Sequence, residues 1–196
     1  MSGPGLFIAV VGPSGAGKDT LIGEARRAVA RQDGIVFPRR VVTRPSSPHE
    51  DNEAIGEAEF AARCEAGAFA LWWQAHGLHY GIPRGVRDDL SAGHTAICNL
   101  SRGAVPEAKR VFSRVAVVLV TAPRAVIVER LAARGREHPE AIAARLEREA
   151  SIEAALAADL VIANVADPAE GGRQLAAFAL FGRQLGAGDQ RVEAGD

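Results

Sequence analysis

A glycine-rich segment near the start of the chain has the residue types of a phosphate-binding loop. The sequence GPSGAGK places Gly12, Gly17 and Lys18 at the spacing G-x-x-x-x-G-K. Glycine lets the backbone approach a phosphate closely, and backbone N–H groups at a helix N-terminus attract anions. An apolar strand pattern precedes the loop and a helical pattern follows it, which is the context that the motif needs. The residues expected to bind a nucleoside triphosphate are Gly12, Pro13, Ser14, Gly15, Ala16, Gly17, Lys18, Asp19 and Thr20.

Asp19 occupies a position where this motif ordinarily has serine or threonine. A carboxylate in the first turn of a helix gains about 0.3–1 kcal/mol from the helix dipole, which is small beside its repulsion from a triphosphate. A cation between the two would remove that repulsion. We therefore expect Asp19 to support a Mg²⁺ ion, directly or through water, with Thr20 completing the metal site. A purely structural role for Asp19 at the helix terminus stays open.

The elements that must position this loop alternate between apolar strands and amphipathic helices. This alternation predicts an α/β domain, a P-loop NTPase-type fold with a mostly parallel sheet and helices on both faces. Strands are expected at 6–11, 39–44, 94–100, 115–122 and 159–164, and helices at 18–31, 57–67, 123–135, 139–158 and 168–182.

The stretch between 44 and 90 interrupts this alternation. It contains a polar, proline-bearing loop at 45–56 and two short strand patterns, 69–75 and 78–83, which we expect to pair antiparallel. We interpret residues 44–90 as an acceptor-binding subdomain and the polar segment at about 134–142 as a lid. The predicted organisation is one kinase domain, 1–182, followed by a flexible tail, 183–196.

Composition narrows the class of protein further. The chain has 196 residues and a formal net charge of −1, which argues against a nucleic-acid partner. No apolar run reaches the roughly 20 residues of a membrane span, and the first strand lacks the features of a signal peptide, so we expect a cytoplasmic protein. Cys64 and Cys98 lack metal-ligand spacing and are interpreted as buried apolar side chains. The oligomeric state stays open.

Several motifs together resemble the guanylate-kinase-like enzymes over roughly residues 6–180. They are GPSGAGKDTL, TRP at 43–45, FALWWQAHGLHYGIP, RLAARGREHPEAIAARL and DLVIAN. The resemblance implies ATP as phosphoryl donor with Mg²⁺. It also implies that Arg44 of the TR motif grips the acceptor phosphate, that Tyr80 of the YG motif assists it, and that Asn164 borders the adenine.

Departures from the guanylate kinase pattern concern the base of the acceptor. Ser47 stands where a second arginine is usual, the EAEF segment lacks the usual tyrosine, and Leu71 replaces a base-reading glutamate. A site that reads guanine needs hydrogen-bond acceptors, because unpaired polar edges are costly. The pattern therefore indicates an acceptor that carries a phosphate but no guanine.

With the unusual GKD sequence, the set GPSGAGKD, TRP, HGLHYGIP and NLSRG is similar to the ribose 1,5-bisphosphate phosphokinase family. This resemblance implies ATP-dependent phosphorylation of the 1-phosphate of ribose 1,5-bisphosphate, giving 5-phosphoribosyl 1-diphosphate and ADP in phosphonate breakdown. Two alternatives stay open: a guanylate or other nucleoside monophosphate kinase, and a non-catalytic binding module. The intact loop argues against the second, because such modules typically lose it.

A phosphate acceptor needs no catalytic base, because a phosphate monoester has a second pKa near 6 and is largely ionised at neutral pH. Catalysis would then come from positioning and charge neutralisation. We expect Lys18 to act together with Arg134, Arg136 and Arg145, which match the arginine-bearing lid pattern of the family. Arg130 is interpreted as a solvated surface arginine.

The acceptor carries two phosphates, so it needs a second cationic anchor besides Arg44. Candidates for this anchor are Arg40, Arg84, Arg87 and Arg102. The residues expected to bind the acceptor are Arg44, Tyr80, Gln74, His76, His79 and Arg102, with the glutamine and histidines placed at the ribose hydroxyls.

Overall fold

The computed structural model describes residues 4–45, 51–133, 157–165 and 167–188. Its central sheet has five strands in the order β2-β7-β1-β8-β9, and every neighbouring pair is parallel. The strands are β1 (Leu6–Val11), β2 (Ile35–Val36), β7 (Thr95–Asn99), β8 (Val115–Thr121) and β9 (Leu160–Ala163). The predicted parallel α/β sheet is confirmed, with β2 as an additional short edge strand.

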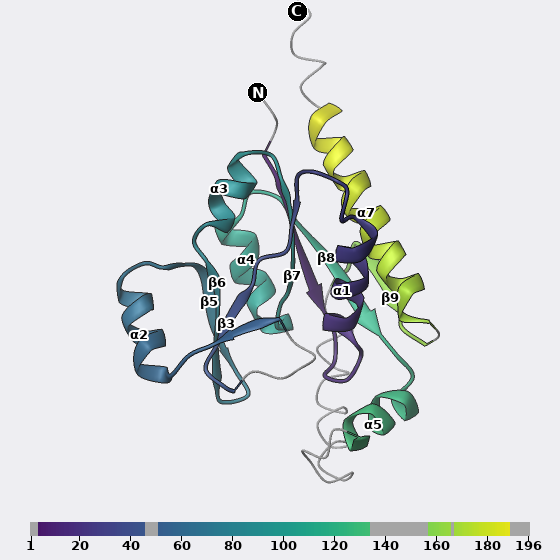
Figure 1. The fold of residues 1–196 in the computed structure, drawn as a ribbon, viewed down its shortest axis with the longest axis horizontal. Helices are drawn as coiled ribbons and strands as arrows, with labels where there is room; N and C mark the ends of the chain where they lie inside the picture. Colours follow the sequence, from purple (N-terminus) through teal and green to yellow (C-terminus); the bar gives the residue numbers. More distant parts are fainter. Residues whose placement is uncertain (1–3, 46–50, 134–156, 166, 189–196) are drawn as a thin grey trace, which may run out of the picture.

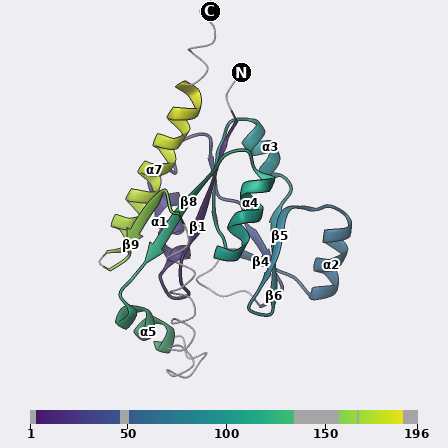
Figure 2. The same ribbon diagram turned by 180° about the vertical axis from the view of Figure 1, so that it is seen from behind.

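Side-chain alternation along β1 explains why helices cover both faces of this sheet. Leu6, Ile8 and Val10 face a cluster formed with α1 (Lys18–Ala28) and α7 (Pro168–Gly188). The intervening side chains of β1 face α4 (Val105–Val111) on the other side. Successive residues of a strand point to opposite faces, so a strand buried on both sides is apolar throughout. Figures 1 and 2 show α1 and α7 together on one side of the sheet.

A second, four-stranded sheet has the order β4-β3-β6-β5 and lies beside the central one (Figure 1). Its strands are β3 (Arg40–Val42), β4 (Asn52–Ala54), β5 (Phe69–Ala75) and β6 (Leu78–Pro83), and α2 (Glu57–Glu65) packs on its outer face. The predicted antiparallel pairing of β5 with β6 is confirmed. The predicted insertion at 44–90 thus contributes to a separate sheet. This sheet begins at β3, before residue 44.

The inner face of the second sheet belongs to the same apolar cluster as α4. Leu71, Trp73, Tyr80 and Ile82 pack with β1, β7 and β8 residues in one continuous buried group. The connecting helices are α3 (Val86–Ser91), the 3₁₀ helix η1 (Arg102–Ala104) and α5 (Arg124–Ala133). Shared burial therefore attaches the second sheet to the central one.

Several predicted boundaries are wrong. Helix α1 ends at Ala28 instead of 31, because Ala30 N–H bonds to the Arg27 carbonyl and the chain tightens into a turn. Residues 52–54 form β4 within the expected loop, since pairing with β3 satisfies their backbone groups. Helix α7 continues to Gly188, so residues 183–188 are helical and do not belong to a flexible tail.

Two predicted features, the lid at about 134–142 and the helix at 139–158, lie largely or wholly outside the described residues. Within the described part of the chain, no helix combines the length and the apolar character needed to cross a membrane.

Candidate functional site

The glycine-rich loop joins β1 to α1 and has a backbone that requires its glycines. Gly12, Gly15 and Gly17 have φ angles of 143°, 85° and 90°, in the region that favours glycine. A Cβ on Gly12 would overlap the Val120 carbonyl oxygen, and a Cβ on Gly17 would overlap the Asn164 amide nitrogen. The loop therefore fits closely against the ends of β8 and β9.

Lys18 begins α1, and its side chain turns back over the loop. Its Nζ donates hydrogen bonds to the carbonyl oxygens of Gly12 at 2.8 Å and Pro13 at 2.9 Å. The ammonium group thus lies beside the backbone that would surround a phosphate, which is the position that the motif predicts.

Asn164 lies against the loop and binds it through its side chain. The Asn164 amide donates to the Ala16 carbonyl at 2.7 Å, and only 4% of the residue is exposed. Arg130 donates to the carbonyls of Asn164 at 3.3 Å and Ala16 at 3.5 Å. The expectation that Arg130 is a solvated surface residue is therefore wrong. Helical spacing could not have identified this role, because the partner lies 34 residues away.

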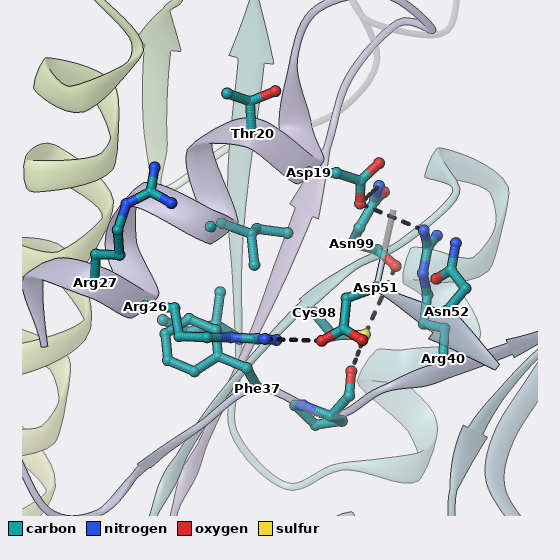
Figure 3. A pocket seen from close by; sticks show the side chains of 14 residues that line it. Asp19, Thr20, Arg26, Arg27, Phe37, Arg40, Asp51, Asn52, Cys98 and Asn99 are labelled. Carbon is teal, nitrogen blue, oxygen red and sulfur yellow. Dashed lines mark hydrogen bonds and ion pairs between the residues drawn. The ribbon is translucent and has the colours of Figure 1, made fainter. Parts of the chain in front are cut away.

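The Asp19 carboxylate lies between an amide and a guanidinium group. Its Oδ1 accepts a hydrogen bond from Asn99 Nδ2 at 2.8 Å and lies 3.5 Å from an Arg40 guanidinium nitrogen (Figure 3). Arg40 and Asn99 are both buried. The negative charge that the loop motif ordinarily lacks is thus opposed by a positive charge from the neighbouring sheet.

The donor atoms near Asp19 fit a Mg²⁺ ion that arrives with a nucleotide. Carboxylate and amide oxygens are suitable ligands, and Mg²⁺ commonly takes one or two carboxylates and completes its shell with substrate phosphates and water. Thr20 is the next residue and is exposed. Among the described residues, no group of three or more histidine, cysteine, aspartate or glutamate side chains could hold a metal alone.

A cavity of about 550 Å³ extends from Asp19 along α1 toward β3 and β4. Two charged pairs line it: Asp19 with Arg40, 3.5 Å apart, and Arg26 with Asp51, an ion pair at 2.7 Å (Figure 3). The lining residues are Asp19, Thr20, Ile22, Gly23, Arg26, Arg27, Phe37, Pro38, Arg40, Asp51, Asn52, Ile97, Cys98 and Asn99.

Tyr80 is held by an aromatic stack that reaches the end of β7. Its ring stacks on Trp73 with centroids 5.4 Å apart and planes 9° apart, and Trp73 Nε1 donates to Ser101 Oγ at 2.8 Å. The Arg40 guanidinium lies 5.9 Å from the centroid of the Tyr80 ring. The stack therefore connects the second sheet to the strand end beside the loop.

Three expected acceptor residues are not brought together with Tyr80. His79 precedes Tyr80 on β6, so it points to the opposite face, where its ring lies 5.4 Å from that of Phe60. Gln74 pairs with His79 across the hairpin and is exposed, and His76 lies in the hairpin turn with a φ of 52°. Strand alternation could have revealed this division, since Trp73 and Tyr80 are the adjacent pair on the inner face.

The structure describes two of the other predicted arginines, Arg44 and Arg102. Arg44 follows β3 by two residues and is half-buried, and Arg102 begins η1 directly after Ser101. Thr43 fixes the chain beside Arg44, because its hydroxyl accepts a hydrogen bond from the His79 N–H at 2.9 Å. The three predicted lid arginines lie outside the described residues; they are Arg134, Arg136 and Arg145.

Cys98 lies in the cavity wall, and its thiol is unreactive because it stays protonated. Burial raises the pKa of its thiol to about 12, so the group stays neutral at physiological pH. Cys64 is half-exposed, which corrects the expectation that both cysteines are buried.

Sequence comparison identifies relatives over nearly the whole chain. No protein-family model matches it. The chain is 48% identical over 174 residues to ribose 1,5-bisphosphate phosphokinase PhnN of Methylobacterium radiotolerans, covering 89% of this chain and 97% of the relative. The proteins of the same name from Rhodopseudomonas palustris and Acidiphilium cryptum are 46% and 48% identical, over 92% of this chain and 91% and 96% of theirs.

Structure comparison supports the fold. The crystal structure of guanylate kinase from Anaplasma phagocytophilum matches with a TM-score of 0.68 at 18% identity, covering 93% of this chain and 88% of that chain. The chain therefore has a guanylate-kinase-like fold. Given this fold and the identity to its relatives, the chain belongs to the ribose 1,5-bisphosphate phosphokinase family.

Proposed function

We propose that this protein transfers the γ-phosphoryl group of ATP to the 1-phosphate of ribose 1,5-bisphosphate, giving 5-phosphoribosyl 1-diphosphate and ADP. The observation that carries this proposal is the 48% identity to a ribose 1,5-bisphosphate phosphokinase over 89% of the chain, with the GPSGAGK loop intact. We place the reaction in the cytoplasm and in the breakdown of phosphonates.

The donor site is proposed to be the loop from Gly12 to Thr20. Its backbone N–H groups would bind the phosphates of ATP, and Lys18 would neutralise charge on the transferring group. Asp19 and Thr20 are the residues proposed to support Mg²⁺, which when bound would supply positive charge to offset that of the phosphates. Asn164 would act on this site by holding the Ala16 carbonyl.

The acceptor site is proposed to lie on the inner face of the second sheet. Arg44 would bind the 1-phosphate, with Tyr80 beside it, and Arg102 is placed near the end of β7 where the acceptor must approach the loop. Leu71 is buried among apolar side chains on this face, so this position offers no hydrogen-bond acceptor for a guanine. A phosphate without a base suits these residues better than a nucleotide does.

No residue is required to remove a proton, because the attacking phosphate oxygen is ionised at neutral pH. The protein's part is to align two phosphates and offset their charge, which is the dominant contribution in phosphoryl transfer. We propose that Lys18, Arg134, Arg136 and Arg145 share this role.

The test is an acceptor panel with purified protein, ATP and Mg²⁺. Ribose 1,5-bisphosphate, ribose 1-phosphate, GMP and AMP are offered separately, and products are identified by mass. We expect 5-phosphoribosyl 1-diphosphate to form fastest. Lys18→Ala should lower turnover by orders of magnitude while keeping its fold, and Lys109→Ala, at an exposed site on α4, should have no effect. Faster phosphorylation of GMP would identify a nucleotide kinase instead.

A further inference from the structure

Arg40 is an unusual residue for its position. Among the described residues it is the only charged side chain that is buried, with 7% exposure. A buried charge is costly unless it is paired and hydrogen-bonded. Arg40 nevertheless begins β3 at the wall of the 550 Å³ cavity, where its guanidinium lies among polar groups (Figure 3).

The pairing of Arg40 with Asp19 leaves capacity for another anion. The two side chains are 3.5 Å apart, at the outer limit of hydrogen-bond distance, and one guanidinium nitrogen makes this contact. Asp19 has a second and shorter partner in Asn99 at 2.8 Å. A guanidinium carries five N–H donors in a planar fork that matches a phosphate, so an entering phosphate can compete for this group.

The position of Arg40 on β3 relates it to the proposed acceptor site. Tyr80 pairs with Val42 across the β3–β6 ladder, and Arg40 precedes Val42 by two residues, on the same face. Arg44 follows Val42 by two residues. Strand β3 ends at Val42, and the chain bends at residues 43 and 44. This short segment therefore carries two arginines: Arg40, whose guanidinium lies 5.9 Å from the centroid of the Tyr80 ring, and Arg44, just beyond the end of the strand.

We infer that Arg40 binds the second phosphate of the acceptor, the 5-phosphate of ribose 1,5-bisphosphate, while Arg44 binds the 1-phosphate. This inference rests on the proposed function, whose acceptor carries two phosphates and which assigns an anchor, Arg44, to the 1-phosphate alone. Arg40 is then a specificity-determining residue: it separates a sugar bisphosphate from a sugar monophosphate.

The test compares two acceptors that differ only in the 5-phosphate. The catalytic efficiency, kcat/KM, is measured for ribose 1,5-bisphosphate and ribose 1-phosphate, and the ratio of the two values is the readout. In the wild type we expect the ratio to reach about 100 or more, because the 5-phosphate would accept charge-assisted hydrogen bonds. Arg40→Gln should lower it by roughly 10- to 100-fold, which is what the loss of one charge-assisted hydrogen bond predicts. Arg40→Lys, which keeps the charge, should recover part of the preference.

Two further variants serve as controls. Arg39→Gln removes a neighbouring charge that is exposed and paired with Asp51 at 3.2 Å, and it should leave the ratio unchanged. Arg44→Ala should reduce the efficiency with both acceptors to a similar degree, because both carry the 1-phosphate. Thermal unfolding verifies that each variant is folded.

Three outcomes would contradict the inference, and two of them can be observed with the wild-type protein alone. A wild-type ratio near one means that no group senses the 5-phosphate. An equal loss for both acceptors in folded Arg40→Gln assigns Arg40 to the 1-phosphate or to the loop. If the wild type phosphorylates neither acceptor, the proposed function itself fails and the inference fails with it. The first two results leave the proposed function intact.

Discussion

Asn164 donates its side-chain amide to the Ala16 carbonyl at 2.7 Å, joining two residues 148 positions apart in the chain. The Arg130 guanidinium also donates hydrogen bonds here, to the carbonyl oxygens of Ala16 and Asn164. The glycine at position 17 leaves space for this amide, because a Cβ there would overlap it. The end of β9 therefore holds the phosphate loop in shape.

Asn164→Ala should weaken the loop. The buried Ala16 carbonyl would lose its partner, which predicts a loss of about 1–3 kcal/mol in the free energy of unfolding, measured with urea. Binding of both ATP and tripolyphosphate should weaken in calorimetry, because the shape of the loop serves the phosphates. A loss confined to ATP would indicate instead that Asn164 contacts the adenine. Val165→Ala, at a neighbouring exposed site, is the matched control.

Asp19→Asn should change the Mg²⁺ requirement. If the carboxylate supports the metal, the variant needs more Mg²⁺ to reach half-maximal rate, and added Mg²⁺ recovers part of the activity. Asp19→Ser should keep substantial activity, because a hydroxyl can ligate Mg²⁺ at this position. Titration of rate against Mg²⁺ decides the matter, and coincident curves for wild type and Asp19→Asn would limit the carboxylate to its contacts with Arg40 and Asn99.

Arg44→Ala should affect the acceptor and spare the donor. Loss of a charge-assisted hydrogen bond to phosphate costs about 1.5–3 kcal/mol, so kcat/KM for the acceptor should fall by roughly 10- to 100-fold. ATP affinity measured by calorimetry should stay unchanged. A collapse of ATP affinity with an unaltered acceptor KM would show that the donor and acceptor sites are assigned the wrong way round.

Cys98 predicts a pH dependence of stability in alkaline solution. Burial raises the pKa of its thiol to about 12, so above the ordinary thiol pKa of about 8.5 the unfolded chain loses this proton more readily than the folded protein. The folded state then binds more protons than the unfolded state, and the free energy of unfolding falls as pH rises from about 8.5 toward 12.

Other groups titrate in the same range, so the measurement is a difference between two proteins. Urea unfolding of wild type and Cys98→Ala is compared at pH 7.5 and pH 10. The wild type should lose more stability between these values than the variant does. Equal losses would mean that the thiol ionises in the folded protein as readily as in the unfolded chain.

Much of the fold could be predicted because its signals are local. The apolar run of β1, the glycine spacing of the loop and the short hairpin of β5 and β6 each lie within about 15 consecutive residues. Strand β4 could not be found in this way. Its pattern is polar, and it exists because β3 supplies parallel backbone partners.

The candidate site likewise has a part that local sequence patterns predict and a part that depends on long-range contacts. The chain by itself determined the phosphate loop, the unusual Asp19, and the arginine and tyrosine of the TR and YG motifs, since each is a residue type at a short spacing. Only the tertiary structure decided that Arg40 opposes Asp19, that Asn164 holds Ala16, and that the ring of His79 lies against that of Phe60. These contacts join elements far apart in sequence, and packing of two sheets on one core brings them together, which no local pattern records.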